Sequence, residues 1–468
     1  MKTIAVLGAP GCGKTTRLME ILTEELKETA PSRIAFVSFT RKGTYEGAKR
    51  AVDLLGLREE DLPYFRTLHS IAFRECRFSR YDMVSRTDYR EFSKLMGMNF
   101  TGYYTEDLFG EDDKYLFAHF LRRNNTKAAD IVEEGMSESK LIEVALNFER
   151  YKKENAVTDF TDVIEQFVAK NTPLPIDVAI VDEAQDLTSL QWQMCEVAFR
   201  NCKKLYIAGD DDQAIYEWSG ADVSKFLVLA RTADEIQVLG KSWRLRKEIL
   251  AEAKGISTMI SDRVDKRFDP VGAGGVVSVY NSLDEIEITA GESWYFLNRN
   301  NYFLSSIREF LRKKIKVFID KEALSYDPKH VEAIKVYEVA RRRGSLADVE
   351  TIKLRSFLNK GYDLKKPWFE SLNFEVDQSA YYRDLIRTKA SLEDRSITVS
   401  TIHGVKGGEA DNVVLTMDFT KSVKESIMKR PDAELRCLYV AVTRAKKGLH
   451  IVHSATKNGY DSFIKIGG

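Results

Sequence analysis

The chain has 468 residues, of which 44% are hydrophobic and 30% charged, and its 71 basic residues balance its 71 acidic ones. This length exceeds one hydrophobic core, so more than one domain is expected, and the balanced charge excludes nucleic-acid binding through a global positive field. No apolar run approaches the ~20 residues that span a bilayer. The five scattered cysteines lack metal-ligand spacing and predict free thiols in a reducing cytoplasm.

The first half of the chain alternates short apolar strands with helical segments. Residues 3–8 (TIAVLG) and 33–39 (RIAFVSF) predict buried strands, and a helix is predicted between them. Two further apolar runs, 178–181 and 205–208, extend the series. Such strands separated by helices favour a parallel, doubly wound sheet. The charged, helical residues 76–170 are expected to be an insertion between two of its strands.

A second series of strands is predicted in the later half. Its strands lie at Val276, Trp294, Ile397, Asn412 and Gly448. Helical residues 303–394 interrupt the series and carry two basic clusters, which are more typical of solvated helix faces than of binding sites. The predicted fold class is therefore α/β, with two parallel-sheet domains in tandem, each with a mainly helical insertion.

A phosphate-binding loop follows the first predicted strand. Residues 8–15, GAPGCGKT, fit the pattern GxxxxGK[ST], in which glycines let backbone N–H groups turn around a phosphate at a helix N-terminus. The lysine would reach the β- and γ-phosphates of ATP, and the threonine hydroxyl would hold Mg²⁺. The residues expected to bind the nucleotide here are Gly11, Gly13, Lys14, Thr15 and Thr16.

An acidic pair follows the strand at 178–181. In IVDEAQD, Asp182 is placed to hold Mg²⁺, and Glu183 is placed to polarise the water that attacks the γ-phosphate. Paired carboxylates alone are typical of solvated turns. The preceding strand and the upstream phosphate loop favour the catalytic interpretation.

The loop GDDDQAIYEWSG, residues 209–220, follows the fourth apolar run. Three carboxylates, a glutamine and two aromatics suit a loop between a nucleotide and a stacking ligand. Gln213 would sense a phosphate or a water, whereas Tyr216 and Trp218 offer flat faces to bases. Taken alone, the two aromatics are more typical of core packing.

Phosphoryl transfer also needs cations against the developing negative charge. Candidates in the later half are Arg244, in SWRLR, and Arg444, in TRAKKGLHIV. Composition alone favours a solvent-facing position for both.

Taken in order, these motifs resemble those of superfamily 1 DNA helicases of the UvrD/Rep/PcrA type, from residue 4 to residue 453. The remaining similar stretches are VSFTRKG (37–43), RTLHSIA (66–72), TDFTDVI (158–164), LGKSWR (239–244), YFLNRNN (295–301), TVSTIHGVKGGEADNVVL (398–415) and LRCLYVAVTRAKKGLHIV (435–452).

The resemblance implies two RecA-like domains and an ATP-dependent helicase or translocase on single-stranded DNA and its junctions with duplex, moving 3′ to 5′, in repair or replication. It implies that Gln213 contacts the γ-phosphate or the attacking water. Arg244 and Arg444 would be arginine fingers from the second sheet domain, Trp243 would stack on adenine, and Glu409 would help bind the nucleotide. The implied DNA contacts are Phe39, Thr40, Arg41, His69, Tyr216, Trp218, Asn301 and His403.

The implied division has four parts. Residues 1–75 and 171–238 would form ATP-binding domain 1A, 76–170 insertion 1B, 239–345 and 395–468 domain 2A, and 346–394 a reduced 2B.

The chain departs from the family pattern at Trp243, where tyrosine is usual, at Ser219, where arginine is common, and in KGGEA (406–410), where KGLEF is usual. The glutamine motif that family members carry upstream of the phosphate loop is also expected to be missing. These departures and the reduced 2B favour one alternative, a DNA-stimulated ATPase that loads or remodels without processive unwinding. A phosphate-loop NTPase without nucleic acid is a third hypothesis, which the motifs at 37–43, 209–221 and 398–415 disfavour.

Overall fold

The computed structural model describes residues 1–38, 41–104, 112–125, 136–320 and 323–466, and only the backbone of 41–43, 46, 54 and 55. By contacts the chain divides into two compact units. Unit 1 contains Met1–Gly274 and Ser426–Thr443, and unit 2 contains Gly275–Glu425 and Arg444–Gly468. The predicted α/β fold with two mostly parallel sheets is confirmed, one sheet in each unit. The division into 1A, 1B, 2A and 2B stays a prediction.

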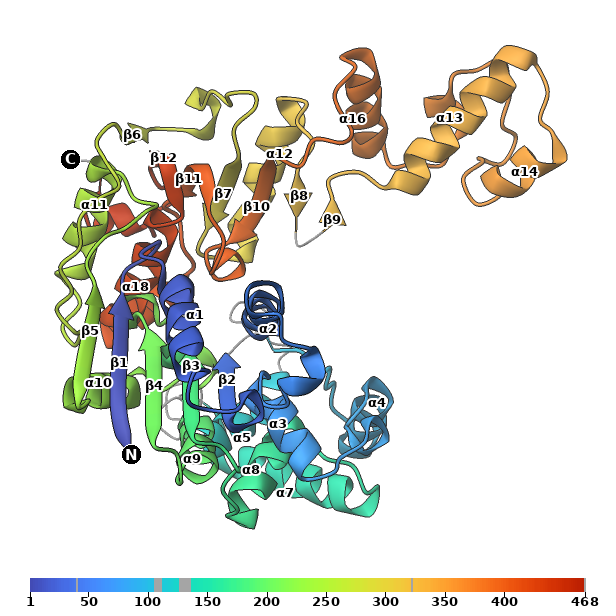
Figure 1. The fold of residues 1–468 in the computed structure, drawn as a ribbon. Coiled ribbons are helices and arrows are strands. Elements are labelled where there is room, and N and C mark those ends of the chain that lie inside the picture. The colour runs from blue at the N-terminus through green and yellow to red at the C-terminus, as the bar shows by residue number, and fades with distance from the viewer. Residues whose placement is uncertain (39–40, 105–111, 126–135, 321–322, 467–468) are drawn as a thin grey trace. The chain divides into compact units, whose positions relative to one another are not determined.

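Unit 1 is built on a five-stranded sheet in the order β2-β3-β4-β1-β5 (Figure 1), and every neighbouring pair is parallel. The central strands are continuous apolar runs because helices cover both faces of the sheet. Carboxyl ends of parallel strands share one edge, so the loops that follow them gather there. The strands are β1 (Lys2–Gly8), β2 (Ile34–Ser38), β3 (Val178–Asp182), β4 (Lys204–Gly209) and β5 (Glu235–Leu239).

Helices of unit 1 flank the sheet or form the insertion between β2 and β3. The helices outside the insertion are α1 (Lys14–Glu25), α9 (Ser189–Ala198), α10 (Val223–Thr232), α11 (Lys247–Ser257) and α18 (Pro431–Val442). Those between β2 and β3 are α2 (Arg41–Leu55), α3 (Leu68–Glu75), α4 (Arg86–Met96), α5 (Asp113–Asn124), α7 (Glu138–Glu154) and α8 (Phe160–Lys170). Part of the insertion has its own core, centred on Phe92, Leu116 and Phe148.

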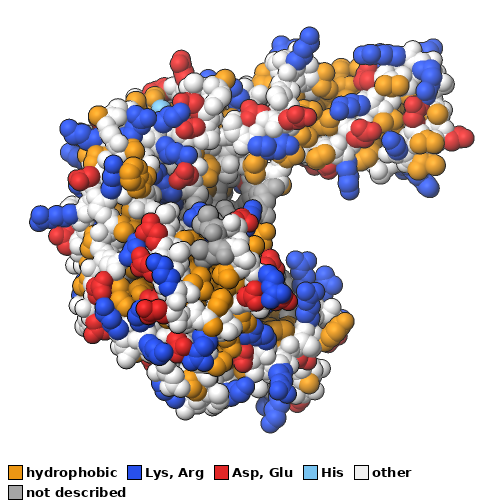
Figure 2. Space-filling model, in the orientation of Figure 1, with side chains coloured by type: hydrophobic (Ala, Val, Ile, Leu, Met, Phe, Trp, Pro, Cys, Tyr) orange, Lys and Arg blue, Asp and Glu red, His pale blue; other side chains and the backbone are white. Residues whose placement is uncertain are grey.

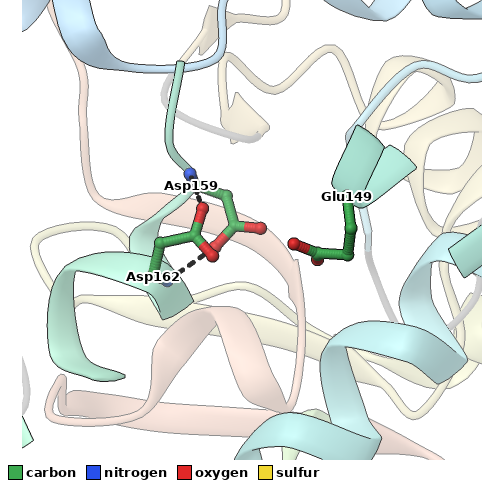
Figure 3. Close-up of side chains that lie close together, drawn as sticks. All are labelled: Glu149, Asp159 and Asp162. Carbon is green, nitrogen blue, oxygen red and sulfur yellow. Dashed lines mark hydrogen bonds between the residues drawn. The ribbon is translucent and has the colours of Figure 1, made fainter. Parts of the chain in front are cut away.

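An ion cluster joins α5, α7 and the start of α8. The carboxylates of Glu149, Asp159 and Asp162 lie close together (Figure 3), a grouping that could in principle hold a metal ion. The chain's own cations neutralise it: Lys152 Nζ lies 3.0, 2.7 and 2.8 Å from the three carboxylates, and Arg123 contacts all three. The TDFTDVI stretch therefore contributes its aspartates to internal packing of the insertion.

Unit 2 is built on a seven-stranded sheet in the order β6-β12-β11-β7-β10-β8-β9, parallel except for the β8–β9 pair. Its first five strands in that order are the ones that the sequence predicts. The strands are β6 (Val276–Tyr280), β7 (Trp294–Asn298), β8 (Ile319–Asp320), β9 (Ala323–Leu324), β10 (Ile397–Thr401), β11 (Ala410–Thr416) and β12 (Ala445–Val452).

A helical cluster lies beyond the β8–β9 edge of this sheet (Figure 1). Its core includes Tyr337, Trp368 and Leu385, so α13 packs with α15 and α16 around shared apolar side chains. The helices of unit 2 are α12 (Leu304–Lys313), α13 (Pro328–Arg343), α14 (Asp348–Leu354), α15 (Trp368–Ser371), α16 (Val376–Arg387) and the start of α17 (Lys421–Lys429).

Charge is distributed without a dominant sign. Figure 2 shows Lys and Arg side chains interspersed with Asp and Glu over the visible face, in keeping with equal numbers of basic and acidic residues. Among the helices that the structure describes, none combines the length and apolar character needed to cross a bilayer.

Candidate nucleotide and nucleic-acid site

The phosphate loop joins β1 to α1 through a tight turn that requires glycine. Gly11 and Gly13 have φ angles of 71° and 82°, in the left-handed region that side chains avoid. A Cβ on Gly8 would lie 2.2 Å from Cys12 Sγ, so the loop also has no room there. The first N–H groups of α1 have no partners within the helix, which makes this end of α1 a favourable place for a phosphate.

The backbone of the phosphate loop holds the Lys14 side chain in place. Its Nζ donates to the carbonyl oxygen of Gly8 at 2.8 Å. Burial lowers the pKa of Lys14, but its charged surroundings outweigh that effect, and the net pKa is raised. The groups responsible, in order, are Cys12, Glu183, Asp210 and Asp182. The structure therefore brings the predicted lysine and the predicted acidic pair into one electrostatic site.

The acidic pair ends β3 in a strained turn. Asp182 is the last residue of the strand and is 6% exposed. Glu183 has a φ of 52°, a left-handed conformation that costs about 1–3 kcal/mol in a residue other than glycine. Its N–H donates to Asp182 Oδ1 at 2.9 Å, and its Oε2 accepts from Gln185 Nε2 at 2.5 Å. The strained turn, with its backbone hydrogen bond, and the hydrogen bond from Gln185 thus restrain the carboxylate expected to act as the base.

Gln185, which the sequence analysis did not single out, connects this turn to the loop after β4. Its Oε1 accepts from the backbone N–H of Asp210 at 3.2 Å, and its side chain is fully buried. The amide of Gln213 donates to Asp210 Oδ2 at 2.7 Å. Asp210 therefore links the candidate base and the candidate γ-phosphate sensor.

The three carboxylates of the loop, Asp210, Asp211 and Asp212, are completely buried. Their cations are Lys266 and Arg263, from the segment after α11, which the sequence analysis also missed. Three consecutive aspartates require cations nearby if they are buried. This requirement is the only feature of the sequence that indicates cationic partners for the loop. No local pattern identifies which lysine or arginine supplies them.

The aromatics of the loop lie next to the helical insertion. The Trp218 ring lies 6.1 Å from that of Phe117, in α5, at an interplanar angle of 37°. Tyr216 is partly buried, and burial raises the pKa of its hydroxyl, so the phenol is neutral. Ser219, in place of the usual arginine, donates to the carbonyl of Tyr216 at 3.0 Å. Trp218 thus has a packing role, whatever else its ring does.

The LGKSWR segment packs directly on the phosphate loop. The Trp243 N–H donates to the carbonyl of Gly11 at 2.7 Å, and the Ser242 hydroxyl donates to Pro10 at 2.8 Å. Trp243 is 64% exposed, and Lys241 Nζ lies 4.1 Å from the centroid of its ring. An exposed indole beside the loop is suitably placed to stack on a nucleotide base.

Arg244 follows on the same segment. A Cβ on Gly11 would lie 2.3 Å from Arg244 Cβ, and Arg244 Nη1 donates to the carbonyl of Thr443 at 3.4 Å. By contacts Arg244 belongs to unit 1, not to the second sheet domain that the sequence suggested.

His69 lies in α3, with its ring 5.8 Å from that of Phe160. Burial lowers the pKa of His69 to about 4, so the imidazole is neutral at physiological pH. It would contact DNA as a hydrogen-bonding group and not as a cation. Three other predicted DNA contacts lie outside the described residues: Phe39 and Thr40 entirely, and Arg41 in its side chain.

The predicted residues of unit 2 lie at two opposite edges of its sheet. Arg444 and Glu409 directly precede β12 and β11, whereas Asn301 and His403 follow β7 and β10. All four strands are parallel, so the first pair marks the amino edge and the second pair the carboxyl edge.

Arg444 is fixed within that amino edge. It is 1% exposed, and its Nη1 donates to the carbonyl of Gly408 at 3.1 Å. Glu409 pairs with Lys446 at 2.9 Å. Unit 2 thus separates the two residues expected at the nucleotide from the two expected at DNA.

Both candidate magnesium ligands supply oxygen atoms, which this ion prefers. Thr15 offers a hydroxyl in the first turn of α1, and Asp182 offers a carboxylate at the end of β3. The charge of Asp182 raises the pKa of Lys14, and Lys14 is next to Thr15 in the chain. The Asp182 carboxylate and the Thr15 hydroxyl therefore lie in the same part of the site. The donor chemistry fits Mg²⁺.

Comparison with known proteins agrees with this geometry. Residues 1–234 match the UvrD/REP helicase N-terminal domain, and residues 396–452 match the UvrD-like helicase C-terminal domain. The chain is 22% identical to the ATP-dependent DNA helicase PcrA of Staphylococcus epidermidis, covering 97% of this chain and 82% of that protein. It is 24% identical to the ATP-dependent DNA helicase Rep of Escherichia coli, covering 64% and 48%.

A probable DNA helicase II homologue of Rickettsia conorii is 21% identical, with coverage of 99% and 92%. Among solved structures, one described as the structure of PRRSV helicase has a TM-score of 0.37 at 10% identity, covering 96% of this chain and 52% of that one. The matched N-terminal domain spans half of the chain, and the chain belongs to the UvrD-like family of ATP-dependent DNA helicases, which are ATP hydrolases.

Proposed function

We propose that this chain hydrolyses ATP in response to single-stranded DNA, moves along that strand from 3′ to 5′, and unwinds duplex at a junction. The observation that carries the proposal is the link from Glu183 through Gln185 and Asp210 to Gln213. Tyr216 and Trp218 follow on the same loop. A chain of hydrogen bonds thus leads from the proposed hydrolytic site toward the aromatics proposed to hold bases.

The proposed hydrolysis assigns one task to each side chain. Lys14 neutralises the β- and γ-phosphates, and Thr15 and Asp182 hold Mg²⁺, which polarises the phosphate when bound. Gln213 orients the attacking water, and Glu183 accepts its proton. The water oxygen forms a bond to the γ-phosphorus as the bond to the bridging β–γ oxygen breaks, leaving ADP and phosphate.

Two arginines complete the proposed nucleotide site. Arg244, beside Gly11, and Arg444, in unit 2, supply positive charge to the phosphoryl group as it leaves. Trp243 stacks on the adenine, and Glu409 helps to bind the nucleotide. The DNA contacts proposed are Phe39, Thr40, Arg41, His69, Tyr216, Trp218, Asn301 and His403. Stacking on aromatics suits movement along any sequence, because every base has a π-face.

The first experiment measures ATP turnover with and without single-stranded DNA for the wild-type chain, Lys14→Ala and Glu183→Gln. DNA should raise wild-type turnover, and each substitution should lower kcat by about 10²-fold or more. Glu183→Gln should still bind ATP, because its amide keeps the shape of the carboxylate but cannot accept the proton. Turnover indifferent to DNA, or an active Lys14→Ala variant, would contradict the proposal.

The second experiment compares forked duplexes that carry either a 3′ or a 5′ single-stranded tail. Strand separation from the 3′ tail alone is expected for the proposed direction. Turnover stimulated by DNA without separation of either substrate would instead support the alternative, a loading or remodelling ATPase. The short segment 346–394, proposed as a reduced 2B, motivates that alternative.

A further inference from the structure

Lys266 is a fully buried cation whose ammonium is directed at one loop. Its Nζ lies 3.0 Å from Asp210 Oδ1 and 3.1 Å from Asp212 Oδ2, and it donates to Asp211. Taking an ammonium out of water costs several kcal/mol, which only close, well-paired anions offset. Lys266 lies in the segment after α11, outside the stretches that resemble family motifs.

Asp210 connects Lys266 to the candidate catalytic amide. One carboxylate oxygen, Oδ1, faces Lys266, and the other, Oδ2, accepts from Gln213 Nε2 at 2.7 Å. The donation fixes which end of the Gln213 amide faces Asp210 and directs the carbonyl Oε1 to the other side. A carbonyl oxygen is the group that can accept an O–H from an attacking water.

Asp210 also interacts electrostatically with Lys14 of the phosphate loop. Burial alone would raise the pKa of Asp210, but Lys266, Lys14 and the Gln213 amide lower it, and the net pKa is lowered. Without Lys266, the nearest cation among these would be Lys14, which the phosphates need. The carboxylate would then either take up a proton or draw Lys14 toward itself, and in both cases its hold on the Gln213 amide would weaken.

We propose that Lys266 is a positioning residue for ATP hydrolysis: it holds the Asp210 carboxylate in the place from which that carboxylate orients the Gln213 amide. The proposal rests on the role proposed above for Gln213. It assigns a task in turnover to the segment after α11, and it separates that task from nucleotide binding, in which Lys266 takes no direct part.

Arg263 provides a matched control. It comes from the same segment and makes two hydrogen bonds to Asp212, at 2.9 and 2.7 Å. It therefore stabilises the same buried loop through a different carboxylate, two residues away from the one that holds Gln213. Arg263→Gln and Lys266→Met each remove one cation from the cluster, but only the second removes the contact to Asp210.

The test measures kcat and KM for DNA-stimulated ATP hydrolysis in these two variants, with thermal unfolding to check that each is folded. For Lys266→Met we expect kcat to fall by about 10-fold to 100-fold with KM within about twofold of wild type, the signature of an interaction that serves the transition state. For Arg263→Gln we expect a lower melting temperature with kcat within about twofold. Equal loss of kcat in the two variants would overturn the proposal.

A double-mutant cycle distinguishes the proposal from its premise. If Lys266 acts through Gln213, Gln213→Ala combined with Lys266→Met will be no slower than Gln213→Ala alone. If the double variant instead shows the product of the two separate losses of kcat, the positioning role is overturned. Gln213→Ala with the wild-type kcat would overturn the proposed function of Gln213, and the inference with it. A slow Gln213→Ala beside an unaffected Lys266→Met would overturn the inference alone.

A second variant keeps the test decisive if Lys266→Met fails to fold. Combining Lys266→Met with Asp211→Asn removes one acid together with the cation, so the net charge of the cluster is kept. The carboxamide oxygen that this substitution introduces can still accept from the N–H of Val264, which donates to the Asp211 carboxylate at 2.8 Å in the wild-type chain. A near-normal melting temperature with low kcat would support the proposal, and near-normal kcat would overturn it.

Discussion

Arg436, in α18, donates through Nη1 to Glu217 Oε1 at 2.7 Å. The pair joins the helix of the LRCLYVAVTRA stretch to the loop that carries Tyr216 and Trp218. Arg436 is 3% exposed and also donates to the carbonyl of Asp262 at 2.8 Å. The ion pair therefore fixes the aromatic loop against an element more than two hundred residues later in the chain.

Glu217→Ala should destabilise unit 1, because it removes the carboxylate to which the buried guanidinium of Arg436 donates. Breaking a buried pair in this way costs about 3 kcal/mol. The free energy of unfolding in urea measures the loss. The control is Arg231→Gln, which removes a surface pair with Asp262 whose side chains are 46% and 56% exposed, and its cost should stay within about 1 kcal/mol. Equal losses would contradict the importance of burial.

Trp218→Ala should weaken single-stranded DNA binding and DNA-stimulated turnover while sparing basal hydrolysis. Loss of one stacked base costs about 1–3 kcal/mol, or roughly 5-fold to 150-fold in Kd. Fluorescence anisotropy with a labelled oligonucleotide gives the affinity. Because Trp218 also packs on Phe117, the matched control is Phe117→Leu, which loosens the same cluster and should leave DNA affinity unchanged. An equal loss of basal and stimulated turnover would refute the stacking role.

Trp243→Ala should raise KM for ATP by about twofold to tenfold, the value of one aromatic stacking contact of about 0.5–1.5 kcal/mol. Trp243→Tyr, which restores a flat ring, should recover the wild-type KM. Steady-state kinetics measure both. Lys241→Met is the control, since it removes the ammonium over the ring but keeps the indole. A Trp243→Ala variant with unchanged KM would exclude adenine stacking here.

Stability should fall with acid through His69. Its pKa is about 4 in the folded chain and about 6.5 unfolded, so the unfolded state binds more protons between those values. The contribution is complete above about pH 6.5 and is lost as the pH falls toward 4, by up to about 3 kcal/mol. Urea unfolding at pH 5.0 and 7.5 should show a smaller difference for His69→Gln than for wild type.

Much of the first sheet and its nucleotide loop follows from local sequence. Buried parallel strands need continuous apolar runs, and their carboxyl ends share one edge, so the sequence predicts Asp182 and Gln213 at that edge. Asp182 is the last residue of β3, and Gln213 lies in the turn after β4. Gly11 and Gly13 likewise follow from local sequence, because glycine is the residue that favours the left-handed conformation found at both positions.

Partners distant in sequence could not be predicted in the same way. Lys266 and Arg263 lie about fifty residues after the aspartates that they pair with, in a segment with no periodic pattern. Gln185 belongs to a recognised stretch, but the hydrogen bond that its Oε1 accepts from Asp210 depends on how two loops meet. For Trp218 the sequence does not decide between two roles, because the same aromatic ring suits both packing in the core and stacking on a base.

The order of synthesis follows from the position of α18. The chain forms the sheet of unit 1 within its first 239 residues, yet α18, which packs against α11, is not made until residue 442. A ribosome therefore completes the strands of unit 2 up to β11 while unit 1 still lacks a helix. The apolar surface beneath α18 stays open during that interval, as a site for chaperones or for aggregation. A fragment ending at Gly274 would retain that open surface permanently.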